Sequence, residues 1–83
     1  MNQSAHITLC DIFIRVLALP SSEEAEEAAY GQTRGWDSVG HMSLVQNIED
    51  EFGLLLGPED IIDMDSFQRA CEVLSRHGIA TLS

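Results

Sequence analysis

The chain has 83 residues, with 14 acidic side chains against four arginines and no lysine, and a formal net charge of −10. This length allows one small domain with a single core, and no apolar run is long enough to cross a bilayer. Nucleic acids and anionic membranes require basic surfaces, so the charge argues against both as partners. It favours protein partners with basic patches, although it is also compatible with a charge that only keeps a small domain soluble.

The sequence contains no sign of export, disulfides or metal ligands. The first six residues carry no cationic side chain, which is not typical of a secretory signal. Cys10 and Cys71 are far apart and fall on apolar stripes, so we expect reduced core residues in a cytoplasmic protein. The histidines His6, His41 and His77 show no metal-ligand spacing with either cysteine, and no metal site is expected.

The spacing of apolar residues predicts a first helix over 7–19, with only a narrow polar strip. Such a helix is either well buried or keeps one face for a partner, and burial is favoured. Pro20 is expected to end it. In the long connection over 20–36, the acidic run after Ser21 and Ser22 is compatible with a short surface helix, which Gly31 and Gly35 would interrupt.

A second helix is predicted over 38–53, with Asp37 as its N-cap and Gly53 at its end. Just before this helix, Trp36 is expected to pack against the core and so hold the connection in place. The alternative is that Trp36 lines the entry to a small apolar cavity. His41 is expected to be a packed, hydrogen-bonded histidine rather than a helper in catalysis. One face of this helix should meet the core through Leu44, Val45, Ile48 and Phe52.

After the second helix, residues 54–56 are expected to continue into the core, and Pro58 to open a short helix. Asp65 and Gln68 fit a capping box for a last helix that Gly78 ends. The apolar stripe of this last helix comprises Phe67, Ala70, Cys71 and Leu74. No strand-like alternation is present. We therefore predict a single all-α domain over 1–83, a small bundle of three main helices and one short helix with a long first loop, and loose ends at 1–5 and 80–83.

The triplet Asp37-Ser38-Val39 resembles the Asp-Ser-Leu signature of acyl carrier proteins, with valine in place of leucine. The similarity extends over about residues 35 to 79, including the acidic segment 49–53 and the pairs 61–62 and 66–67. It implies the four-helix carrier fold and a protein that is not itself an enzyme. It also implies that Ser38 carries 4′-phosphopantetheine, transferred from coenzyme A, whose thiol holds an acyl chain as a thioester.

The physical context of Ser38 agrees with this resemblance. As first residue of the helix, it would lie beside free backbone N–H groups at the positive end of the dipole, where a phosphate is favoured. The expected partners are a phosphopantetheinyl transferase, in whose recognition Asp37 should help, and acyl-transferring, ligase or synthase enzymes with basic docking patches. The carrier is expected to be a monomer. The candidate docking residues are Val39, Met42, Glu49 and Asp50.

Two positions depart from carriers of ordinary fatty-acid synthesis, which usually have acidic residues where Gly40 and Ser43 stand. The Gly-Trp-Asp-Ser start and His41 look more like specialised carriers of secondary or polyketide-like pathways. An aminoacyl or peptidyl carrier, and an unmodified acidic helical interaction domain, are the alternatives.

Two catalytic or metal-binding motifs are excluded by their spacing. The segment from Gly35 to Gly40 approaches a nucleophile elbow, but its first glycine comes one place too early and no strand precedes it. The aspartates of segment 60–65 lack the glycine and the glutamate that a calcium-binding loop requires.

Overall fold

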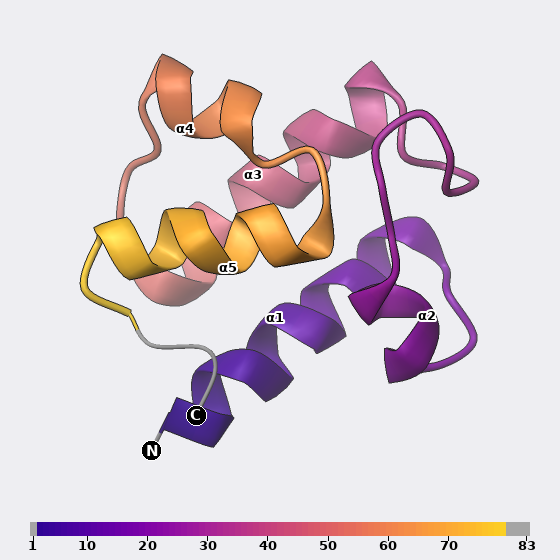
Figure 1. The fold of residues 1–83 in the computed structure, drawn as a ribbon, viewed down its shortest axis with the longest axis horizontal. Helices are drawn as coiled ribbons and strands as arrows, with labels where there is room; N and C mark the ends of the chain where they lie inside the picture. The colour runs from indigo at the N-terminus through magenta and orange to yellow at the C-terminus, as the bar shows by residue number, and fades with distance from the viewer. Residues whose placement is uncertain (1, 80–83) are drawn as a thin grey trace.

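The computed structural model describes residues 2–79, which form five helices and no strand (Figure 1). Three helices are long: α1 (Asn2–Leu17), α3 (Ser38–Phe52) and α5 (Phe67–Arg76). Two are short: α2 (Ser22–Glu26) and α4 (Pro58–Asp63). The predicted all-α class is confirmed, and the long first connection contains a short helix of its own. None of the helices within the described range is both long and apolar enough to span a membrane.

Helix α1 differs from its prediction at both ends. It begins at Asn2, so residues 2–5 are helical rather than loose, while Met1 and residues 80–83 lie outside the described residues. It ends at Leu17, before the proline, because Ala18 adopts a left-handed conformation with φ of 54°. The N–H of Leu19 then donates to the carbonyl of Ile14 at 3.1 Å, which completes a local C-terminal cap.

The core lies between the long helices. Helix α1 packs against α2 and α3, and α5 packs against α2 and α4. The predicted stripe of α5 is buried, as are three of the four predicted core residues of α3, with Phe52 partly buried. Both cysteines are buried and free of disulfide bonds. One prediction was wrong: Leu56 is buried, but Leu55 beside it is 81% exposed, so only part of this segment enters the core.

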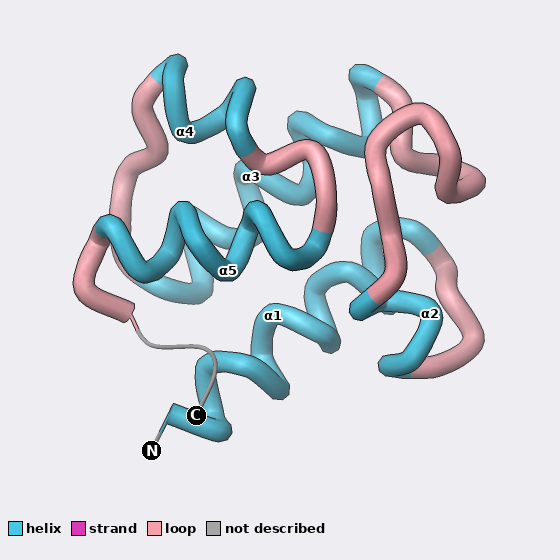
Figure 2. The backbone as a smooth tube through the Cα atoms, in the orientation of Figure 1, coloured by secondary structure: helices cyan, strands magenta, loops and turns pink. Residues whose placement is uncertain are grey.

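The connection after α2 is held against the start of α5. The N–H of Tyr30 donates to the carbonyl of Asp65 at 2.8 Å, and the N–H of Phe67 donates to the carbonyl of Ala28 at 3.1 Å. Figure 2 shows this connection rising along one side of the molecule to the start of α3. These backbone bonds between distant segments fix where the residues that precede α3 lie.

The same bonds correct the predicted cap of α5. An N-cap carbonyl accepts the first bond within its helix. In α5 the N–H of Ala70 donates to the carbonyl of Ser66 at 2.9 Å, whereas the carbonyl of Asp65 accepts the N–H of Tyr30. Ser66 is the N-cap instead, and its hydroxyl accepts the N–H of Arg69 at 3.1 Å. At the other end His77 is the C-cap, and Gly78 follows it with φ of 84°.

Candidate functional site

The start of α3 is built by Asp37, the predicted N-cap, which the structure confirms. Its backbone is extended, and its Oδ1 accepts the N–H of Gly40 at 2.9 Å. Its carbonyl accepts the N–H of His41 at 2.7 Å. Ser38 follows as the first helical residue and is exposed to solvent.

Because the side chain of Asp37 caps the helix, the hydroxyl of Ser38 is not needed for a structural hydrogen bond. The serines Ser21 and Ser66 also lie at helix N-termini, but each is an N-cap whose Oγ accepts a backbone N–H. No residue of the described range hydrogen-bonds to Ser38 Oγ or accepts the N–H groups of Ser38 and Val39. An exposed hydroxyl and two free amide donors therefore lie together at the positive end of α3.

Ser38 lies at the edge of an open, mostly apolar depression of about 270 Å³. Around it, Val39, Met42 and Ile62 are 75%, 52% and 76% exposed. No pattern in the sequence associates residues 30, 61, 62 and 65 with Ser38, because the connection and α4 bring them there through tertiary contacts. The depression is lined by Tyr30, Ser38, His41, Met42, Ile61, Ile62 and Asp65.

Beneath this depression, His41 links α3 to the connection and to α4. The indole N–H of Trp36 donates to His41 Nδ1 at 3.0 Å, so the imidazole proton resides on Nε2, 2.7 Å from the carbonyl of Ile61. The predicted packed histidine is confirmed. With both ring nitrogens engaged, His41 has no lone pair left to act as a base. Trp36 is 2% exposed, which confirms its packing role.

Ion pairs hold α4 against α5. Arg76 contacts Asp60 at 3.1 Å and Asp63 at 2.8 Å, and His77 Nε2 lies 2.8 Å from Asp60. The hydrogen bond with His77 is the main reason that the pKa of the Asp60 carboxyl lies below its usual value. This network keeps Ile61 in position to accept the hydrogen bond of His41.

The two acidic docking candidates have different environments. Asp50 is exposed, whereas Glu49 is partly buried and its carboxylate accepts the N–H of Leu56 at 2.9 Å. Glu49 therefore organises the segment between α3 and α4. Asp50 lies twelve residues from Ser38, or about 18 Å along the helix axis.

Gly40 has a structural reason to lack a side chain. A Cβ atom at this position would overlap the carbonyl oxygen of Gly35. The backbone before α3 therefore passes directly over the first turn of the helix, and this close approach explains why no acidic residue stands at position 40.

We expect Gly40→Ala to lower the free energy of unfolding by about 1 to 3 kcal/mol, because backbone atoms must move to admit the methyl group. Helix propensity alone would give the opposite result, because alanine is more favourable than glycine within a helix by about 1 kcal/mol. Urea denaturation followed by circular dichroism measures it. Ser43→Ala, on the exposed side of the same helix, is the matched control; equal stability of the two variants would contradict the close approach.

A second group of side chains was missed by the sequence analysis. Because α1 begins at Asn2 rather than at residue 7, His6 is helical and stands one turn before Cys10. Helix α2 adds Glu26, whose Oε2 lies 2.8 Å from His6 Nε2. Burial raises the pKa of the Cys10 thiol to about 11, and the charge of Glu26 adds to the effect. The statement that no histidine has ligand spacing with a cysteine was therefore wrong for this pair.

No protein-family model matches the chain, and no curated protein is significantly similar to it in sequence.

Proposed function

We propose that the protein is an acyl carrier protein that carries 4′-phosphopantetheine on Ser38. The observation that carries the proposal is the free, exposed hydroxyl of Ser38, one residue past a side-chain cap and at the edge of an apolar depression. The resemblance of residues 35–79 to the carrier family supplies the identity of the group.

The surroundings of Ser38 fit a phosphodiester. The unengaged N–H groups of Ser38 and Val39 point out of the helix terminus, where the dipole stabilises negative charge by about 0.3 to 1 kcal/mol. The group supplies a flexible thiol that forms thioesters. The protein supplies an attachment point, an apolar surface beside it and a face that enzymes recognise. In this proposal the protein is not itself an enzyme, and it works in the cytoplasm.

Incubation with a promiscuous phosphopantetheinyl transferase and coenzyme A tests the proposal. Intact-mass spectrometry should show a single addition of one phosphopantetheine group. An unchanged mass for the folded chain would contradict the proposal and favour an unmodified acidic interaction domain. Loading of the modified chain by fatty-acyl or aminoacyl ligases then distinguishes an acyl carrier from an aminoacyl or peptidyl carrier.

We further propose that partner enzymes dock on the surface formed by Val39, Met42 and Asp50. Exposed apolar side chains beside Ser38 suit a small hydrophobic pocket, and the distant charge of Asp50 suits steering by arginines. Glu49 belongs to the same helix, but its reversal would also break the bond to Leu56. Asp50 therefore gives the cleaner test.

Asp50→Lys is expected to slow modification of Ser38 about two- to tenfold at low salt, by weakening encounter with the transferase. The difference from wild type should shrink as salt rises, because exposed charges are screened over about 10 Å at 0.1 M. Met42→Ala should weaken the complex by about 1 kcal/mol with little salt dependence. Transfer rates at several salt concentrations measure both effects.

Glu27→Lys is the matched control, because it changes the net charge equally but stands at the end of α2. We expect it to leave the rate near that of wild type. If Glu27→Lys slows transfer and Asp50→Lys does not, the acidic segment 23–27 is the electrostatic docking surface instead of α3.

A further inference from the structure

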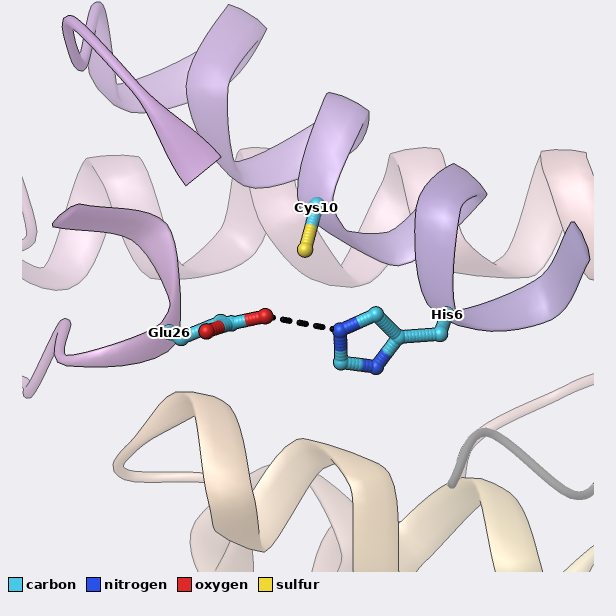
Figure 3. A group of neighbouring side chains, drawn as sticks. All are labelled: His6, Cys10 and Glu26. Carbon is cyan, nitrogen blue, oxygen red and sulfur yellow. Dashed lines mark hydrogen bonds and ion pairs between the residues drawn. The ribbon is translucent and has the colours of Figure 1, made fainter. Parts of the chain in front are cut away.

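His6, Cys10 and Glu26 bring three different ligand types together, on the side of α1 that faces α2 (Figure 3). His6 and Cys10 are separated by one helical turn, and Glu26 comes from α2. One ligand atom from each residue lies within 4.8 Å of the other two. Figure 3 shows the carboxylate and the imidazole pointing toward each other, with the Cys10 sulfur above the space between them.

We propose that these three side chains form a Zn²⁺ site that links α2 to α1. Nitrogen, sulfur and carboxylate oxygen are the three ligand types that zinc uses in proteins. This assignment is independent of the function proposed for Ser38, because the cluster includes no residue that lines the depression beside Ser38.

The geometry needs only small adjustments. In a tetrahedral zinc site, bond lengths near 2.0 to 2.3 Å place neighbouring ligand atoms about 3.3 to 3.6 Å apart. The Nε2 of His6 and the Oε2 of Glu26, now 2.8 Å apart, would separate by about 0.5 Å. The Cys10 sulfur lies within 4.8 Å of one ring nitrogen of His6 and one carboxylate oxygen of Glu26, and would approach them by no more than about 1.5 Å.

The cluster is accessible to an ion from solvent. Cys10 is 4% exposed, whereas the side chains of His6 and Glu26 are 25% and 47% exposed. An ion can therefore enter from solvent and keep a water molecule as its fourth ligand. A thiolate, a carboxylate and a neutral imidazole balance the charge of Zn²⁺, and the thiol proton leaves to solvent as the sulfur binds. The ring of His6 is held edge-on against Phe67 with centroids 5.6 Å apart, and its buried Nδ1 has no hydrogen-bond partner among the described residues.

Titration of the untagged, chelator-treated chain with Co²⁺ and Zn²⁺ tests the site. We expect one ion per chain, a thiolate-to-cobalt absorption band, and a rise in melting temperature with Zn²⁺, because an ion that binds only the folded chain stabilises it. Cys10→Ala should abolish the band. His6→Gln and Glu26→Gln should each lower zinc affinity at least about tenfold.

The chain offers a matched control for each ligand: Cys71→Ala, His77→Gln and Glu27→Gln should keep the band and the affinity. His77 is the informative control, because it pairs with the carboxylate of Asp60 at 2.8 Å, as His6 pairs with Glu26, but that pair includes no cysteine. Absence of the cobalt band from the wild type, or its survival in Cys10→Ala, would overturn the site. If Cys10→Ala does not fold, Glu26→Gln decides the question, because it changes a surface carboxylate; unaltered zinc affinity in that variant would also overturn the site.

Discussion

Ser38→Ala is expected to abolish addition of phosphopantetheine completely, because the proposed phosphodiester is formed through Ser38 Oγ. Intact mass after incubation with transferase and coenzyme A should equal that of the untreated variant. The free energy of unfolding should change by less than about 0.5 kcal/mol, since the hydroxyl is exposed and no described residue hydrogen-bonds to it. Loss of modification without loss of stability is the expected combination.

Ser43→Ala is the matched control for this experiment, because it removes an exposed hydroxyl from the same helix. It should be modified like the wild type. The capping serines Ser21 and Ser66 are poorer acceptors, because their hydroxyl groups already accept backbone N–H groups. An addition of normal size on Ser38→Ala would show that another residue is the attachment site.

Trp36→Ala should have the largest effect on stability. The Trp36 side chain is 2% exposed, meets the ring of Phe13 edge to face with centroids 5.2 Å apart, and lies parallel to His41 at 6.0 Å. Truncation of a buried aromatic side chain costs about 3 to 5 kcal/mol. A domain of this size has a total stability of only about 4 to 12 kcal/mol, so the variant should be close to unfolding. Trp36 is the single tryptophan, so the variant has no tryptophan fluorescence with which to follow unfolding. Urea denaturation followed by circular dichroism is therefore the appropriate measurement.

Trp36→Phe separates packing from hydrogen bonding. It keeps an aromatic ring but removes the indole N–H, which leaves Nδ1 of His41 without its donor. We expect a loss of about 1 to 3 kcal/mol from this unpaired, part-buried acceptor and the smaller ring. Tyr30→Ala is the comparison, because the ring of Tyr30 also contacts Trp36 but is 45% exposed. A Trp36→Phe variant as stable as the wild type would mean that the bond to His41 adds nothing to the fold.

Local signals in the sequence predicted several features near the candidate site. Asp37 caps α3, Gly53 ends it with φ of 65°, and Pro58 opens α4, as predicted. These features depend on residues within one helical turn, so side-chain chemistry and backbone preference suffice to specify them. The amphipathic stripe of α5 was equally predictable, because the helical period places its members on one face whatever they pack against.

The sequence by itself therefore determined the all-α class, both ends of α3, the start of α4 and the position of Ser38 directly after the N-cap. Tertiary structure decided the features that depend on distant segments. The carbonyl of Asp65 bonds to Tyr30, and Ser66 rather than Asp65 is the cap of α5. The depression beside Ser38 arises where the connection, α3 and α4 meet, and the pairing of α1 with α2 brings Glu26 to His6. Sequence patterns report the preferences of neighbouring residues, whereas such contacts form only when the packing of the whole chain brings distant backbone and side-chain groups together.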